Sequence, residues 1–293
     1  MNVDRRRLLV SACLLVWLAL SSAVGQTTTV VKPHPILEPF ETHQLDSKLM
    51  ARKISYRVVL PIDYGASNET TRYSVIYLLH GLTGNFANWT NKTKLAEYAS
   101  KQKFIVVTPD GANGWYTDSA TVANDKYESY IVKELIPEID KNFRTIADRR
   151  GRAIAGLSMG GYGAVKFGLK YPEMFSLVGT FSGALGAASY SEKNAGAIGK
   201  GIDAIYGPDE SETRKANDIF KLIRELTPDR IKTLPFIYQS CGTEDFLFKN
   251  NHDFLALLIE KKIPHEYREH PGGHDWTFWD AQVKEFLRVA VAR

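Results

Sequence analysis

Cysteine is scarce in this sequence, which has two cysteines, Cys13 and Cys241, in 293 residues. Cys13 lies in an apolar N-terminal segment that we expect to be removed as part of a signal peptide. The remaining chain then has Cys241 alone and cannot form an internal disulfide. No base lies beside Cys241 in the sequence, so we interpret it as a small buried residue rather than a nucleophile.

The sequence also lacks an excess of charge of one sign. It has 37 Lys and Arg against 33 Asp and Glu, a net charge of +4, and no basic stripe of the kind that binds nucleic acid. The hydrophobic fraction of 44% and the charged fraction of 24% are those of an ordinary globular protein. A chain of this length can bury a sizeable core, so neither a metal nor a disulfide is needed to stabilise it.

Long hydrophobic runs are missing as well, since the apolar segment 8–20 is too short for a confident membrane span. It follows Arg5-Arg6-Arg7 and precedes small polar residues, which is the pattern of a signal peptide. We predict a signal peptide over 1–25 with cleavage after Gly25, one domain over 26–293, a secreted or periplasmic location and no stable membrane anchor. An uncleaved anchor is the alternative, and a twin-arginine signal fits weakly. The oligomeric state is not indicated.

After the N-terminal segment, short apolar runs alternate with amphipathic segments. This alternation predicts the α/β class, with a mostly parallel central sheet and helices on both faces. In such sheets the chemistry gathers on the loops that leave the carboxyl ends of the strands. Residues 184–233 are less periodic and are predicted to be an excursion over the sheet edge, with a helix near 219–226. β structure is predicted over 42–60, with period-two alternation over 49–60. Further strands are predicted over 73–79, 104–108, 152–155, 175–181, 235–239 and 265–270, and helices over 91–103, 127–142, 162–170, 250–262 and 278–291.

The most distinctive stretch is Gly156-Leu157-Ser158-Met159-Gly160-Gly161, a G-x-S-x-G run between a predicted strand and a predicted helix. This context is that of a nucleophile elbow, in which a sharp turn projects the serine hydroxyl from the sheet. Side chains beside the turn would collide with it, so glycine is used there. We therefore predict that Ser158 is a nucleophile.

A serine hydroxyl needs a base to take its proton, and histidine is suited to that role. We select His274, because it follows Pro271-Gly272-Gly273 in a loop from which its ring could reach Ser158. A carboxylate must then orient the ring, and Asp245 is our choice, with Glu244 as the fallback. Asp275 is too near His274 in the chain and is interpreted as a cap of the loop or of the last helix. The other histidines considered after Ser158 are His252, His265 and His270.

Acyl transfer also requires hydrogen-bond donors for the developing oxyanion. We predict the backbone N–H of Met159, directly after the serine, and that of Leu82, in the loop after the strand 73–79. Gly81 would allow a close backbone approach. His80 is interpreted as structural, with a side chain that bridges loops.

Two aromatic residues, Trp115 and Tyr116, lie on a loop at the predicted active edge. We predict that they form an aromatic wall of the substrate site, with loop packing as the alternative. Trp276 and Trp279 flank His274 and are interpreted as packing residues.

Taken together, these motifs resemble the esterase D-like α/β-hydrolases, a family that includes carbohydrate esterase family 1 feruloyl and acetyl esterases, tributyrin-type esterases, S-formylglutathione hydrolases and mycolyltransferases. The resemblance implies an α/β-hydrolase fold for a single catalytic domain over 26–293, a triad of Ser158, Asp245 and His274, and oxyanion donors at Leu82 and Met159. It covers about 49–291 but none of the segment 184–233. The motifs are His80-Gly81-Leu82, Asn113-Gly114-Trp115-Tyr116-Thr117-Asp118, Tyr127-Glu128-Ser129-Tyr130, the elbow with Tyr162-Gly163-Ala164, Cys241-Gly242-Thr243-Glu244-Asp245 and Gly273-His274-Asp275-Trp276.

We therefore predict a secreted serine esterase that needs no cofactor or metal. Its substrate would be a small-molecule or polysaccharide-linked ester, such as an acetyl or feruloyl group on a polysaccharide. Two alternatives use the same acyl-enzyme: transfer to a sugar alcohol, as in mycolyltransferases, and thioester hydrolysis, as in S-formylglutathione hydrolases. A non-catalytic binding protein on this scaffold is disfavoured by the complete set of triad and oxyanion residues.

Overall fold

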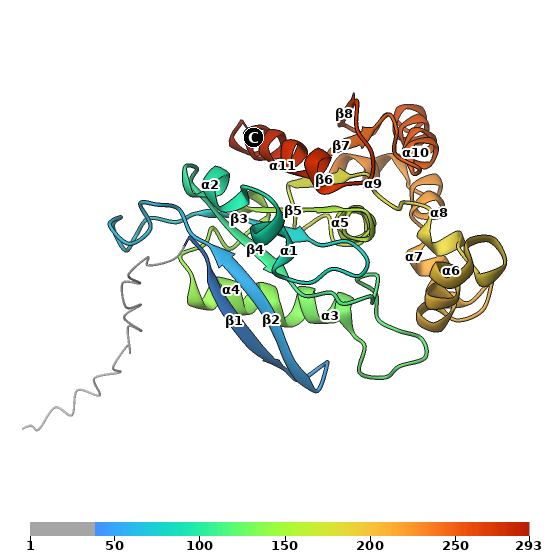
Figure 1. The fold of residues 1–293 in the computed structure, drawn as a ribbon, viewed down its shortest axis with the longest axis horizontal. Coiled ribbons are helices and arrows are strands. Elements are labelled where there is room, and N and C mark those ends of the chain that lie inside the picture. Colours follow the sequence, from blue (N-terminus) through green and yellow to red (C-terminus); the bar gives the residue numbers. More distant parts are fainter. Residues whose placement is uncertain (1–38, 293) are drawn as a thin grey trace, which may run out of the picture. The chain divides into compact units, whose positions relative to one another are not determined.

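A single sheet organises the computed structural model, which describes residues 39–292. Its strands are β1 (Glu41–Ser47), β2 (Arg52–Val59), β3 (Ser74–Leu79), β4 (Phe104–Pro109), β5 (Arg152–Leu157), β6 (Leu177–Phe181), β7 (Phe236–Gly242) and β8 (His265–His270). They pair in the order β1-β2-β4-β3-β5-β6-β7-β8 (Figure 1). The strands from β4 to the edge strand β8 in this order are parallel to one another. At the other edge, β2 pairs antiparallel with β4, and β1 pairs antiparallel with β2. The predicted mostly parallel α/β sheet is confirmed.

The central strands are apolar on both faces because helices cover both faces of the sheet. In β3, Val75, Tyr77 and Leu79 belong to one core, whereas Ile76 and Leu78 belong to the other. Each of these side chains is at most 1% exposed. Because successive residues point into the two cores in turn, residues 75–79 show no alternation of polar and apolar positions.

Helices and single turns connect the strands. They are α1 (Asn88–Lys92), α2 (Leu95–Ser100), α3 (Tyr127–Tyr130), the π-turn η1 (Ile131–Leu135), α4 (Ile136–Asn142), the 3₁₀ turn η2 (Arg149–Gly151), α5 (Met159–Lys170), the 3₁₀ turn η3 (Ala187–Ser189), α6 (Glu192–Tyr206), α7 (Glu212–Asn217), α8 (Ile219–Arg224), α9 (Pro228–Thr233), α10 (Phe248–Glu260) and α11 (Trp276–Val291). One core contains residues of α1, α2 and α11, and the other contains residues of α3 to α6, α8 and α10. The two faces of the sheet are thus covered by different helices (Figure 1).

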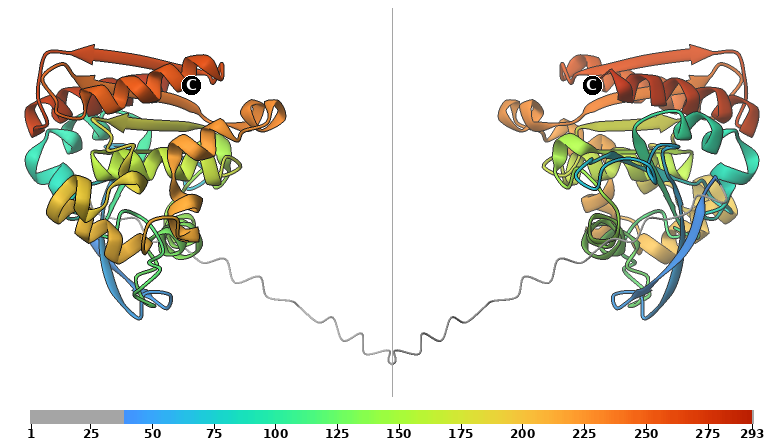
Figure 2. Two further views of the ribbon diagram at one scale, coloured as in Figure 1. Left: turned by 90° about the vertical axis from the view of Figure 1, so that its right-hand side faces the viewer. Right: turned by 90° about the vertical axis from the view of Figure 1, so that its left-hand side faces the viewer.

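Two helix predictions differ from the structure. The helix predicted over 91–103 is two helices, because the chain is extended at Thr93, whose hydroxyl accepts from the N–H of Leu95 at 3.1 Å. The segment 184–233 is more helical than predicted and contains η3 and α6 to α9 (Figure 2, gold to orange). Helix α6 is interrupted at Gly196, whose backbone is not helical, with φ 53°. The helical spacing of apolar residues is therefore not continuous along α6, and this spacing is the pattern from which a helix is predicted.

The predicted signal peptide over 1–25 and the chain up to residue 38 lie outside the described residues. The described part of the chain belongs to one compact unit. Among residues 39–292, no helix is both long and apolar enough to cross a bilayer.

A buried ion pair joins α5 to α3. Lys166, which is fully buried, places its Nζ 3.0 Å from Glu128 Oε2. Lys170 and the Tyr171 hydroxyl contact the other oxygen of Glu128 at 2.6 and 2.7 Å. Burial alone would raise the pKa of Glu128, but these contacts, chiefly the two lysines, lower it to about 2. Burial lowers the pKa of Lys166 to about 8, so both groups are charged at neutral pH.

This pair predicts a pH-dependent stability. The pKa of Glu128 falls on folding from about 4.5 to about 2, so its charge stabilises the fold above pH 4.5 and this contribution is lost as the pH falls toward 2. We expect Glu128→Gln to be less stable than the unaltered protein by about 3 to 5 kcal/mol at pH 7, because the buried ammonium group of Lys166 loses the carboxylate that compensates its charge. The difference should shrink toward zero near pH 2, as measured by urea unfolding at a series of pH values. A difference that stays constant with pH would contradict this assignment.

Candidate active site

Ser158 lies at a sharp turn between β5 and α5. Its backbone has φ 52° and ψ −117°, a strained combination for a residue other than glycine. A Cβ atom on Gly156 would come within 2.5 Å of the Gly160 backbone, and one on Gly160 would come within 2.5 Å of the Leu79 carbonyl oxygen. The predicted steric need for glycine on both sides of the serine is therefore met in the structure, which has the geometry of a nucleophile elbow.

The structure brings Ser158, His274 and Asp245 into one hydrogen-bonded line. His274 Nε2 lies 3.0 Å from Ser158 Oγ, and His274 Nδ1 lies 2.8 Å from Asp245 Oδ2. The three side chains come from the loops after β5, β8 and β7. A carboxylate accepts hydrogen bonds only, so Nδ1 carries the proton and Nε2 is left to accept the proton of the serine hydroxyl.

The environment of Asp245 keeps it ionised. Its side chain is fully buried, and its Oδ1 accepts the N–H of Leu247 at 2.8 Å. Burial alone would raise the pKa of this carboxyl, but the hydrogen bonds from His274 and Leu247 lower it below its usual value. Asp245 can therefore stabilise a positive charge on His274.

The neighbouring carboxylates have other partners. The exposed Glu244 accepts a hydrogen bond from the Gly272 N–H instead of contacting His274. Asp275 is the N-cap of α11 and accepts the N–H groups of Thr277 and Phe278 at 2.8 and 3.0 Å, so its predicted capping role is confirmed.

The two predicted oxyanion donors lie on segments next to Ser158. Met159 is the first residue of α5, where a backbone N–H has no partner within its own helix. A Cβ atom on Gly81 would lie 3.4 Å from the Cβ of Ser158, so the loop that carries Leu82 passes close to the serine. His80, 1% exposed, accepts the Gly111 N–H on Nε2 at 2.9 Å and therefore donates from Nδ1 to the Gly81 carbonyl at 2.8 Å. Its predicted role as a bridge between loops is confirmed.

Comparison with known proteins agrees with this geometry. The family model Esterase matches residues 47–289 of the chain. The chain belongs to the Esterase family of carboxylic ester hydrolases. An acetyl esterase of Caldicellulosiruptor saccharolyticus is 30% identical over 248 residues, which are 81% of this chain and 92% of that protein.

Solved structures of similar proteins support the α/β-hydrolase fold of this esterase. A ferulic acid esterase has a TM-score of 0.74 and 29% identity, and the alignment covers 86% of this chain and 97% of that one. The fluorophosphonate-binding serine hydrolase F of Staphylococcus aureus has a TM-score of 0.75 and 26% identity, with 86% and 98% covered.

A cavity of about 440 Å³ opens beside Ser158 and His274 of the esterase. Two of its lining side chains are large exposed apolar groups, Phe246 at 75% and Ile198 at 47% exposure. The Phe246 ring packs against the His274 ring in a tilted arrangement, with 4.5 Å between centroids and 48° between the ring planes. Phe246 directly follows Asp245 in the chain, but no sequence motif marks it as a residue of the site. The remaining lining residues are Gly81, Leu82, Thr83, Gly84, Asn88, Lys92, Leu157, Asp275, Trp276 and Trp279.

The prediction of an aromatic wall from Trp115 and Tyr116 is wrong. Trp115 is 3% exposed and packs edge-on against Tyr162, and Tyr116 is fully buried. Neither residue lines the cavity. Trp276 and Trp279 do line the cavity. Trp279 is 6% exposed and belongs to a core cluster, and the two rings meet edge-on with 5.2 Å between centroids, so their interpretation as packing residues is confirmed.

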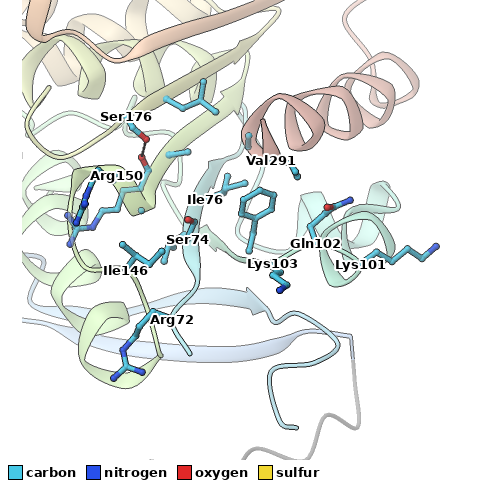
Figure 3. A pocket seen from close by; sticks show the side chains of 17 residues that line it. Arg72, Ser74, Ile76, Lys101, Gln102, Lys103, Ile146, Arg150, Ser176 and Val291 are labelled. Atoms are coloured by element: carbon cyan, nitrogen blue, oxygen red, sulfur yellow. Dashed lines mark hydrogen bonds between the residues drawn. The ribbon is translucent and has the colours of Figure 1, made fainter. Parts of the chain in front are cut away.

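A second cavity, of about 590 Å³, lies at the amino ends of the central parallel strands (Figure 3). Its lining includes Arg72, Lys101, Lys103 and Arg150 but neither histidine nor a carboxylate. It therefore offers no histidine and carboxylate for a serine triad, which lies instead at the opposite, carboxyl edge. Within the described residues, no group of three or more His, Cys, Asp or Glu side chains is arranged to hold a metal ion.

Proposed function

We propose that the chain is a serine esterase that hydrolyses carboxylic esters through an acyl-enzyme on Ser158. The observation that carries this proposal is the line of hydrogen bonds from Ser158 through His274 to Asp245, at 3.0 and 2.8 Å. Ser158 Oγ attacks the ester carbonyl carbon while His274 Nε2 takes its proton. The C–O bond to the alcohol then breaks, and His274 protonates the departing oxygen.

Water completes the cycle by the same route. It attacks the acyl carbon, gives a proton to His274 and releases the carboxylic acid, and His274 returns the proton to Ser158 Oγ. In both steps the carbonyl oxygen becomes negative, and the N–H groups of Leu82 and Met159 donate to it.

We further propose that the substrate is an acetyl or feruloyl ester carried by a polysaccharide. The cavity beside Ser158 supports an acyl group with an apolar surface, because Phe246, Ile198, Trp276 and Trp279 line it. The names of the acetyl esterase and ferulic acid esterase among the similar proteins support the same substrates. A panel of feruloyl, acetyl-xylan and short-chain p-nitrophenyl esters would rank them.

Secretion is part of the proposal. It is supported by the basic residues Arg5-Arg6-Arg7 and the apolar segment 8–20. We expect the exported protein to begin at Gln26, which the intact mass of the processed chain would check. A chain that keeps residues 1–25 in the exporting cell would contradict cleavage.

The test of the mechanism is covalent labelling. A fluorophosphonate probe should react with one serine, and peptide mass spectrometry should place the adduct on Ser158. The protein should also hydrolyse p-nitrophenyl acetate, and prior labelling should abolish that activity. Absence of both labelling and hydrolysis would refute the mechanism.

Phe246 predicts a selective effect on aromatic acyl groups. Phe246→Ala should raise KM for a feruloyl ester about fivefold, because an aromatic contact contributes roughly 0.5–1.5 kcal/mol. The KM for p-nitrophenyl acetate should change less than twofold, and its kcat should remain, which would show that His274 is still aligned. Ile62→Ala is the matched control, since Ile62 is also exposed, at 77%, but does not line the cavity. An equal change in KM for both esters would exclude this role for Phe246.

A further inference from the structure

Tyr116 lies beneath the loop that carries Leu82. It is fully buried, and its hydroxyl donates to the His80 carbonyl oxygen at 2.9 Å. Burial raises the pKa of Tyr116 well above its usual value, so the hydroxyl keeps its proton and remains a donor. The ring is enclosed by Gly111 and Gly163, where an added Cβ atom would lie 2.4 and 2.7 Å from it. The hydroxyl is therefore held against one peptide group by a ring that has no room to move.

The loop of Tyr116, residues 110–117, also contacts Thr83, the residue that follows Leu82. Asn113 accepts the backbone N–H of Thr83 on its Oδ1 at 2.8 Å. The carbonyl bound by Tyr116 belongs to His80, two residues before Leu82, and the N–H bound by Asn113 belongs to the residue directly after it. The backbone around Leu82 is thus tied on both sides to one neighbouring loop.

A buried cation holds this neighbouring loop in place. Trp115 and Tyr116 both have left-handed backbones, with φ 50° and 51°, which are strained for aromatic residues. Lys166 Nζ donates to the Tyr116 carbonyl and to Thr117 Oγ1, each at 2.6 Å. Lys166 belongs to α5, the helix that begins directly after Ser158. One helix therefore supports both the nucleophile and, through Tyr116, the loop of Leu82.

We propose that Tyr116 is a positioning residue for the oxyanion hole. Its hydroxyl fixes the His80–Gly81 peptide so that the Leu82 N–H points to where the oxyanion forms. This inference rests on the proposed esterase function, and it gives the buried Tyr116 side chain a role that requires no contact with substrate. An oxyanion donor acts in the transition state, so a displaced donor lowers kcat while leaving KM nearly unchanged.

The test is Tyr116→Phe, which removes only the hydroxyl and keeps the enclosed ring. We expect kcat for p-nitrophenyl acetate to fall about tenfold, with KM changed less than twofold, because one aligned hydrogen bond is lost. The matched control is Tyr73→Phe. Tyr73 is 1% exposed and its hydroxyl donates to Ser67 Oγ at 2.6 Å, away from the cavity. Both variants should lose similar thermal stability, but only Tyr116→Phe should lose kcat.

Asn113→Ala provides a second measurement on an exposed residue that is not part of the core. It should also lower kcat at nearly constant KM, and its effect combined with Tyr116→Phe should not be additive, since both act on one loop. The positioning role is overturned if Tyr116→Phe keeps the kcat of the unaltered protein, or if Tyr73→Phe loses as much. Failure of the esterase function would look different, because the unaltered protein would then show neither fluorophosphonate labelling nor hydrolysis.

Discussion

Ser158→Ala is expected to lower kcat/KM for p-nitrophenyl acetate by about 10⁵- to 10⁶-fold, the scale seen when a catalytic serine is removed. The alanine cannot form the acyl-enzyme, and His274 then has no hydroxyl to deprotonate. The variant should fold normally, because Ser158 Oγ has its hydrogen bond to His274 at the cavity and alanine fits the same turn. Initial rates with a purified, folded variant would check the prediction.

Ser176→Ala is the control for this loss. Ser176 lies at the amino edge of the sheet, where its hydroxyl donates to the Arg152 carbonyl at 3.2 Å (Figure 3). Its replacement should leave kcat and KM within about twofold, as for a surface substitution. If Ser158→Ala kept more than a few per cent of the activity, another nucleophile would have to carry the reaction.

Asp245→Asn is expected to lower kcat by about 10⁴-fold, as for the corresponding change in serine proteases. The asparagine amide can donate to His274 Nδ1, which would favour the tautomer with its proton on Nε2. That nitrogen could then no longer accept the proton of Ser158. KM should change little, since Asp245 does not line the cavity.

The adjacent acid offers a sharp control for Asp245. Glu244 precedes it in the chain, but it is exposed and hydrogen-bonded to the Gly272 N–H. Glu244→Gln should keep most of the activity. If Glu244→Gln lost activity and Asp245→Asn did not, the geometry around His274 would have to change on substrate binding.

The strands and the candidate site could be predicted because short sequence patterns, each within a few residues, indicate them. A short apolar run such as 73–79 predicts a strand that is buried on both faces of a sheet. A serine flanked by glycines at the end of such a strand predicts the sharp turn of a nucleophile elbow. The acid and the base are expected to follow the serine in the chain, which reduces the number of candidate residues for these two roles. The structure places the residues chosen, Asp245 and His274, in hydrogen-bonded contact with each other and His274 in contact with Ser158.

Non-local contacts explain what could not be predicted. The loop of the buried Trp115 and Tyr116 is contacted by Lys166, which lies 50 residues from Tyr116 in the sequence and whose ammonium group binds the Tyr116 carbonyl. Nothing in the loop sequence indicates this cation. Phe246 shows the reverse case, since a large apolar residue is expected to be buried but here lies exposed at the cavity.

The position of β8 makes the esterase activity sensitive to local unfolding at the edge of the sheet. β8 is an edge strand of the sheet, its residues are all at least partly exposed, and the loop that carries His274 leaves its end. Edge segments exchange their amide hydrogens through small openings that leave the central strands intact. An opening that detached β8 would withdraw His274 from Ser158 while Ser158 stayed in place. The protein would then be inactive but still largely folded, so enzyme assays would report the integrity of this strand rather than that of the core.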